Sequence, residues 1–173
     1  RWYVMVERIA NRFTVDLPNR ALVLRYLPDD VLRQQALTVH TFDKPLQSFS
    51  ESMFSFMKDH GGAGLAAPQV GVLYRVIAVD IKGEYRLLIN PEIESSSSER
   101  GSETEGCLSI PNHLYDVDRS YKAEVRARTP GGKQLHFLAE GFLARVVQHE
   151  IDHLNGRLIC DKGIEVETFT PSS

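Results

Sequence analysis

Two histidines and a glutamate near the end of the chain have the residue types and spacing of a metal-dependent hydrolytic site. His149 and His153 are four residues apart, so on a helix their rings lie on one face and can bind the same metal ion. Glu150 follows the first histidine, where a carboxylate can take a proton from a metal-activated water. The competing interpretation is a helix with two surface histidines and a solvated glutamate. Because Phe142 and Val146 continue the histidine stripe, the pattern favours an inward-facing site.

A catalytic tetrahedral metal site needs a third protein ligand and an open position for water. After His153 the chain has no further histidine, and Glu165 and Glu167 lie in a polar tail. Upstream, Cys107 follows a Glu-Gly pair, and its thiolate is a good ligand for a soft or borderline metal. The commoner fate of a free cysteine is that of a small buried apolar residue, but this would leave the site without a third ligand. We therefore predict Cys107 as a ligand and Cys160 as a structural residue.

A third segment, residues 62–69, reads Gly-Ala-Gly-Leu-Ala-Ala-Pro-Gln. Small residues let a backbone run close to a ligand, and the glycine spacing is not that of a phosphate-binding loop. Gln69 ends the segment with an amide that can donate hydrogen bonds to a developing oxyanion. Taken alone, the segment is more simply explained as a helix cap and loop.

The three segments, residues 64–69, 105–109 and 149–153, together resemble the signature motifs of the peptide deformylases, and the resemblance covers roughly residues 24–161. It implies that Cys107, His149 and His153 bind one divalent metal ion, Fe(II) in the typical member, with zinc, nickel or cobalt as substitutes. The implied substrates are nascent polypeptides at the ribosome that begin with N-formyl-methionine. Their hydrolysis yields formate and a free amino terminus.

The resemblance also implies roles for individual residues. Glu150 would accept the proton of the water and deliver it to the leaving amine. The side-chain amide of Gln69 and the backbone N–H of Leu108 would stabilise the oxyanion. The implied substrate contacts are the backbone of Gly64 and, around the methionine side chain, Ala63, Phe142 and Val146. We expect Asp152, which points off the metal face, to hold a backbone group or a cation rather than to act in catalysis.

Two features depart from the family pattern. Members often carry a glycine or a basic residue after the Ile-Pro pair, where this chain has Asn-His-Leu-Tyr-Asp at residues 112–116, which makes His113 a secondary candidate for a substrate contact. The chain also ends soon after Asp161, without the long carboxy-terminal helix of many bacterial members. Both departures bear on substrate range more than on chemistry.

Two other functions stay open from the sequence. A zincin-like metallopeptidase shares the histidine motif, but its third ligand would be a histidine or a glutamate. A deformylase-like module that binds peptides without catalysis would have a damaged centre, whereas every motif position is intact here.

The elements that must position these residues follow from the apolar pattern. Apolar residues at three-to-four spacing predict helices over residues 45–60 and 142–154, the second of which carries the histidine pair. Short segments with a strand-like pattern, flanked by turn residues, predict strands at residues 74–80, 85–90, 92–95, 121–129 and 134–139. The last two are expected to form a hairpin. We expect a serine-rich loop over 95–102 and a frayed polar tail over 162–173. The pattern predicts an α+β fold, with small antiparallel or mixed sheets packed around a C-terminal metal-binding helix and an N-terminal amphipathic helix.

Length and composition agree with one catalytic domain over residues 1–173, with residues 1–20 left unplaced. A chain of 173 residues with 42% hydrophobic content can bury a core without disulfides. The formal net charge of -3 argues against direct nucleic-acid binding, and no apolar run is long enough to span a membrane. The first residues do not resemble a signal peptide, and two cysteines favour a reducing compartment. We expect a cytoplasmic protein of a bacterium or a virus-infected cell, or an organellar one if a transit segment has been removed.

Overall fold

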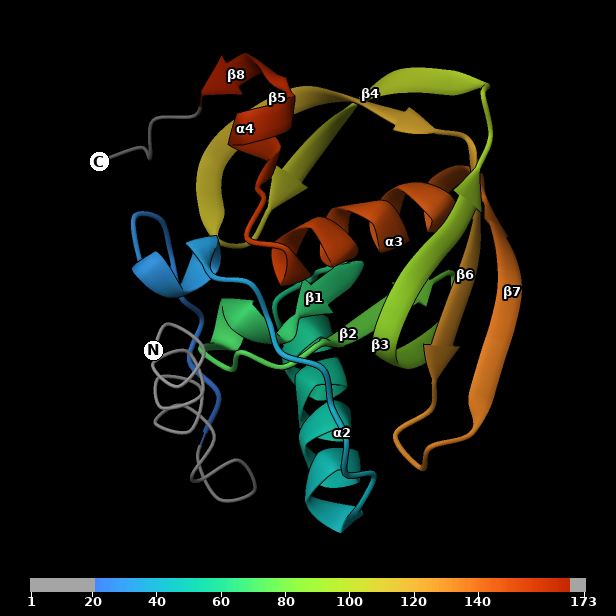
Figure 1. Ribbon diagram of the computed structural model, residues 1–173. Helices are drawn as coiled ribbons and strands as arrows, with labels where there is room; N and C mark the ends of the chain where they lie inside the picture. Colours follow the sequence, from blue (N-terminus) through green and yellow to red (C-terminus); the bar gives the residue numbers. More distant parts are fainter. Residues whose placement is uncertain (1–20, 169–173) are drawn as a thin grey trace, which may run out of the picture.

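The computed structural model describes residues 21–168, which form an α+β fold of two antiparallel sheets and a few helices (Figure 1). The larger sheet has the order β1-β2-β3-β6-β7 and the smaller one β4-β5-β8. The strands of the larger sheet are β1 (Gly64–Ala66), β2 (Val76–Ile81), β3 (Glu84–Ser96), β6 (Lys122–Arg128) and β7 (Gln134–Glu140). Those of the smaller sheet are β4 (Arg100–Cys107), β5 (Ile110–Ser120) and β8 (Ile164–Thr168). The α+β fold with antiparallel sheets is confirmed.

The amphipathic helix expected over residues 45–60 is α2, Lys44–Asp59. The side chain of Asp43 caps its first turn by accepting a hydrogen bond from the Leu46 N–H at 3.1 Å, which satisfies one of the free donors at a helix start. Its apolar stripe, which includes Phe49 and Met53, is buried against one face of the larger sheet. Gly61, with a φ of 68°, follows the last turn in the left-handed conformation that commonly ends a helix.

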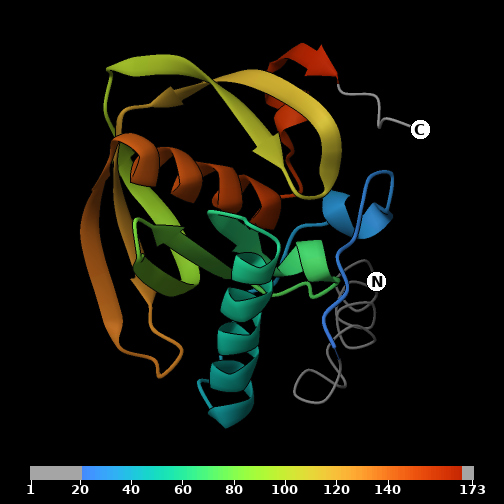
Figure 2. The ribbon, with the colours of Figure 1, turned by 180° about the vertical axis from the view of Figure 1, so that it is seen from behind.

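The C-terminal helix α3, Gly141–Leu154, lies between the two sheets, as the opposite views of Figures 1 and 2 show. It packs against the face of the larger sheet opposite α2. Successive side chains of a strand point to opposite faces, and in β2 Ile77 and Val79 contact the α3 cluster, whereas Val76 and Ala78 contact the α2 cluster. The larger sheet is therefore covered on both faces, and the histidine-bearing helix is held in the centre of the molecule.

Two predictions about β3 were wrong. The strand does not end before Pro91, because Asn90 adopts a φ of 51° and the pairing with β6 shifts register between Ile89 and Glu92. Such a bulge leaves a residue outside the ladder, and this accommodates a proline without an N–H. The loop expected over residues 95–102 is also much shorter, since β3 continues to Ser96 and β4 begins at Arg100. The hairpin predicted from residues 121–129 and 134–139 is confirmed as β6 and β7.

The expected frayed tail was wrong for its central part. After a short helix α4 (Ile159–Lys162), the strand β8 pairs antiparallel with β5, for example Tyr115 with Glu165. The partner of β8 lies some fifty residues earlier in the chain, so periodicity within the tail does not reveal it. The unplaced residues 1–20 and the last residues of the tail, 169–173, lie outside the described part of the chain.

Of the helices between residues 21 and 168, none is both long and apolar enough to cross a membrane.

Candidate metal centre

The two sheets and α3 bring three potential metal ligands together. His149 and His153 lie one turn apart on α3, with ring centroids 5.1 Å apart. Cys107 is the last residue of β4, and its Sγ lies 3.3 Å from Nε2 of His153. One donor atom of each of the three residues lies within 4.8 Å of the others. A thiolate and two imidazoles at this separation suit a tetrahedral divalent metal with one position left for water.

Glu105 orients the first of the two histidines. Its Oε1 lies 2.8 Å from Nδ1 of His149, and because a carboxylate accepts, this nitrogen donates and Nε2 is left to face Cys107 and a metal. Burial acts to raise the pKa of Glu105, but hydrogen bonds from His149 and Arg119 outweigh it and lower the pKa to about 2. Glu105 is therefore ionised near neutral pH.

The electrostatics of the two histidines differ, and both suit a bound cation. Burial disfavours charge on His149, but hydrogen bonds with Cys107 and Glu105 and the nearby Glu150 raise its pKa to about 10. The groups that stabilise a proton there also stabilise a metal cation. The pKa of His153 lies well below its ordinary value, because burial and the charges of His149 and Arg119 oppose protonation. The neutral imidazole is the form that binds a metal.

Glu150 faces the same site from α3. Its side chain is buried, and Oε2 has no hydrogen-bond partner among the described residues. Burial raises the pKa of this carboxyl to about 7, although His149 and Arg119 act in the opposite direction. A pKa near the working pH suits a group that first accepts and later returns a proton. A buried carboxylate oxygen without a partner also provides an acceptor for a water molecule.

Gly64 makes room for Glu150. A Cβ at Gly64 would overlap the Glu150 carboxylate and would lie only 2.8 Å from Cγ1 of Val146. Because real Cβ contacts are never this short, a side chain at Gly64 must displace Glu150. Sequence reasoning connected Gly64 with the substrate backbone, and the structure adds this second requirement.

We therefore predict that Gly64→Ala lowers kcat/KM by about 10²-fold, the loss expected when a catalytic group moves by about 1 Å. The measurement compares the hydrolysis of the expected N-formyl-methionine substrate, and the metal content, with those of the unsubstituted protein. Gly131→Ala is the matched control, because the nearest atom to a Cβ there is Oγ1 of Thr129 at an ordinary 3.8 Å. Unchanged kinetics for Gly64→Ala would contradict the close approach to Glu150.

The amide of Gln69 is held in one orientation. Gln69 is buried in the short helix η2 (Ala67–Val70) that follows β1. Its Oε1 accepts a hydrogen bond from the Ala66 N–H at 2.9 Å, and its Nε2 donates to Oγ of Ser109 at 3.2 Å. Because a backbone N–H can only donate, the Ala66 contact places the Nε2 group toward Cys107, whose Sγ is 3.6 Å away. The amide therefore presents its donor side to the candidate centre.

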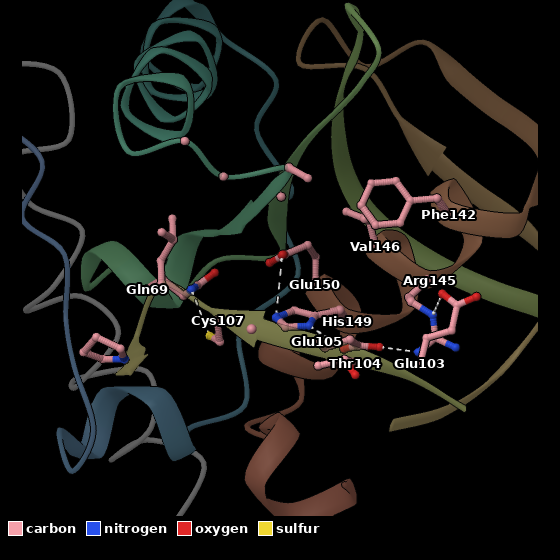
Figure 3. Close-up of a pocket in the computed structure, with 17 residues that line it drawn as sticks. Gln69, Glu103, Thr104, Glu105, Cys107, Phe142, Arg145, Val146, His149 and Glu150 are labelled. Atoms are coloured by element: carbon pink, nitrogen blue, oxygen red, sulfur yellow. Dashed lines mark hydrogen bonds and ion pairs between the residues drawn. The ribbon is translucent and has the colours of Figure 1, made fainter. Parts of the chain in front are cut away.

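These residues surround a cavity of about 540 Å³ (Figure 3). It brings together nine of the ten site residues predicted from the sequence: Ala63, Gly64, Gln69, Cys107, Leu108, Phe142, Val146, His149 and Glu150. Phe142 is 57% exposed. His153 is buried and does not line the cavity. His113 does not line it either, because it lies on β5 with Nδ1 2.7 Å from Glu165, so the suggestion of a substrate contact there is not supported by its position.

Three charged residues around the centre were not predicted. Glu105 belongs to the motif that contains Cys107, but no role was assigned to it. Arg119 on β5 pairs with both Glu105 oxygens at 2.6 and 2.9 Å and also contacts Asp152 at 2.9 Å. Asp152 holds Lys162 at 2.9 Å as well, which confirms that it binds cations.

The third of these charged residues is Arg145, which contacts Glu105 from α3. Its signal in the sequence is an arginine within the apolar stripe, one turn before His149.

Comparison with known proteins finds one family over nearly the whole described part of the chain. The family model described as polypeptide deformylase matches residues 22–168. A peptide deformylase of Treponema pallidum is 44% identical over 140 residues, which cover 80% of this chain and 86% of that protein. The crystal structure of a peptide deformylase from Synechococcus elongatus in complex with actinonin has a TM-score of 0.80 and 42% identity, over 84% of this chain and 79% of that one. A Met-Ala-Ser-bound class I type b peptide deformylase from Acinetobacter baumannii has a TM-score of 0.78 and 32% identity, over 83% and 98% of the two chains.

Proposed function

Because the chain belongs to the polypeptide deformylase family, we infer that it hydrolyses the formyl group from the N-terminal formyl-methionine of nascent polypeptides in a metal-dependent reaction. The observation that carries this proposal is the grouping of Cys107, His149 and His153 beside the unpartnered Oε2 of Glu150. We propose that residues 1–173 act as a single catalytic domain. The substrate emerges at the ribosome, so we place the reaction there, in a cytoplasm or an organelle that starts translation with formyl-methionine.

A peptide substrate is supported by two sheet edges at the cavity. Within the described residues, β1 pairs only with β2, and β4 pairs only with β5, so each strand has a free edge. Gly64 of β1 and residues 103–107 of β4 both line the cavity. An extended peptide can bind such edges through its backbone. Because the Acinetobacter relative binds the peptide Met-Ala-Ser, we propose that this chain also binds a short peptide that begins with methionine.

The donor set fits a divalent metal ion, and we propose that Cys107, His149 and His153 bind it. From the family resemblance we propose Fe(II), with zinc, nickel and cobalt as alternatives. When bound, such an ion lowers the pKa of a water molecule and polarises a carbonyl oxygen. Glu105 acts behind the ligands, because its hydrogen bond holds the Nδ1 proton of His149 and directs Nε2 at the centre.

We propose that three residues of the chain carry out proton transfer and stabilise the developing negative charge. Glu150 accepts the proton of the attacking water at its free Oε2 and transfers it to the leaving amine, so that formate and a free amino terminus result. The Nε2 group of Gln69 and the backbone N–H of Leu108 donate hydrogen bonds to the formyl oxygen as it becomes negative, a contribution worth about 10²–10³-fold in rate per donor. Both donors come from residues at the cavity wall.

The apolar part of the cavity is our proposed pocket for the methionine side chain. Phe142 and Val146 lie one turn apart on α3 (Figure 3), and Ala63, which precedes Gly64, lines the same cavity. Phe142 is more than half exposed, and a bound methionine would cover part of this surface. Covering exposed aromatic surface stabilises a complex in proportion to the apolar area removed from water.

The two competing functions are less well supported. A zincin-like peptidase would use a histidine or glutamate as third ligand, but the donor that accompanies the two histidines is Cys107. A binding module without catalysis would not be expected to retain both the ligand set and a buried, unpartnered glutamate at the same cavity.

The proposed function is tested by measuring formate release from formyl-Met-Ala-Ser with protein loaded anaerobically with Fe(II). We expect turnover with this peptide and none with acetyl-Met-Ala-Ser, whose additional methyl group tests the size of the acyl site. An unformylated peptide cleaved at an internal bond would instead favour the peptidase. Formate release no faster than that of a Glu150→Ala variant would contradict the proposal.

A further inference from the structure

Arg145 is a buried arginine in the part of α3 that faces the cavity. It lies one turn before His149, and only 7% of its surface is exposed. A buried guanidinium is unfavourable unless its N–H groups are paired. The proposed mechanism does not use this residue, so its position next to the metal ligands requires another explanation.

The guanidinium of Arg145 is held by the smaller sheet. Its Nη1 donates to the carbonyl oxygen of Val117 on β5 at 2.8 Å, and its Nη2 donates to the carbonyl oxygen of Gly101 on β4 at 2.8 Å. Its Nε lies 3.0 Å from a carboxylate oxygen of Glu103 on the rim of the cavity. These contacts come from two strands and leave the plane of the guanidinium little freedom to rotate.

The same guanidinium binds the carboxylate that orients His149. Nη1 of Arg145 donates to Oε2 of Glu105 at 2.6 Å, and Oε1 of Glu105 accepts from Nδ1 of His149 at 2.8 Å (Figure 3). Arg119 binds Glu105 from β5, the strand paired with the one that carries Glu105. Glu105 is therefore fixed between two guanidinium groups, one of which belongs to the helix that carries the histidine ligands.

We propose that Arg145 is a positioning residue for the metal centre, which acts through Glu105 to fix the ring of His149. The proposal rests on the metal site of the proposed function. Carbonyl groups of two strands hold the guanidinium, the guanidinium holds the Glu105 carboxylate, and the carboxylate holds the imidazole. Since Arg145 and His149 are four residues apart on α3, this chain of contacts also sets the distance between that helix and the strand that ends at Cys107.

An arginine is required for this role for a geometric reason. Its planar fork presents several N–H groups in fixed directions, whereas a lysine presents one compact ammonium group. A lysine at position 145 keeps the charge, but its three N–H donors diverge from a single nitrogen and cannot reproduce contacts that are spread over Nε, Nη1 and Nη2. Arg145→Lys should therefore recover only part of what Arg145→Met loses.

The test is a measurement of Co(II) affinity by chelator competition, with the visible spectrum of the bound cobalt as a second readout of ligand geometry. We expect Arg145→Met to weaken Co(II) binding by about 10–100-fold, the range typical of lost partners behind metal ligands. Arg145→Lys should be intermediate, and the cobalt spectrum should change in both variants. Arg100→Met is the matched control, because Arg100 is an exposed arginine on β4 that pairs with Asp118, outside both groups of potential metal ligands.

A double-variant cycle tests the route through Glu105. If Arg145 acts through this carboxylate, Arg145→Met should cause little further loss of Co(II) affinity in a Glu105→Gln background. If the fold-losses of Co(II) affinity caused by the two single substitutions multiply in the double variant, the two residues act independently, which would contradict the route. An unchanged affinity and spectrum in Arg145→Met, with only a lower Tm, would reduce Arg145 to a structural residue and overturn the proposal. Failure of the unsubstituted protein to bind one Co(II) ion would instead contradict the metal site itself.

Discussion

Replacing Glu150 by glutamine will lower kcat for formate release by about 10²–10⁴-fold, the usual contribution of a general acid–base group. The amide keeps the size of the side chain but cannot accept and return a proton. Metal content should stay at that of the unsubstituted protein, because the three ligand residues are unchanged. The measurement is steady-state kinetics of the Fe(II)-loaded proteins together with metal analysis.

The pH profile separates this role from a loss of packing. Glu150 must be ionised to accept a proton, so activity should rise with pH as its carboxyl ionises, and glutamine should abolish that part of the profile. Glu51→Gln on the exposed face of α2 is the matched control, since it makes the same chemical change far from the cavity. A Glu150→Gln protein with nearly full kcat would mean that another group moves the proton.

Replacing Cys107 by alanine will remove stoichiometric metal and reduce deformylation to background. The loss of a ligand should weaken metal binding by more than the roughly 10–100-fold that follows the loss of a partner behind a ligand. The thiolate also contributes the negative charge that two neutral imidazoles lack. Metal analysis after dialysis against a weak chelator, followed by the formate assay, measures both effects.

The second cysteine offers a close control for this experiment. Cys160 is a free cysteine that is partly buried, as Cys107 is, but it lies in α4 next to Arg33 and Asp161 rather than at the cavity. Cys160→Ala should retain metal and activity. A Cys107→Ala protein that keeps one tightly bound metal would favour the zincin-like alternative, in which the third ligand is a histidine or a glutamate.

The local pattern of the chain was sufficient to predict much of the fold. The apolar spacing over residues 45–60 and 142–154 predicted α2 and α3 to within a residue or two, because helix periodicity is set by backbone geometry. Alternation around the Pro-Gly-Gly turn similarly predicted the β6–β7 hairpin. Strand ends were harder to predict from the sequence. A proline such as Pro91 commonly ends a strand, but here it lies in a bulge, and β3 continues to pair with β6 on both sides of it.

The candidate ligands could also be named from the sequence. The four-residue spacing of His149 and His153 is a property of one helix, and the missing third ligand directed attention to Cys107. That the three donors meet within 4.8 Å was decided by the tertiary structure, which places the end of β4 against α3.

The residues that support the ligands were outside the reach of sequence reasoning. Glu105 contacts His149 across 44 positions of the chain, and Arg119 contacts Asp152 across 33. Gly64 is required because Glu150, far along the chain, occupies the space of its missing side chain. The sequence by itself determined the chemical types at the centre and the helix that carries two of them, because both depend on near neighbours. The orientation of His149, the room for Glu150 and the role of Arg145 depend on contacts between distant segments, and these exist only once the two sheets enclose α3.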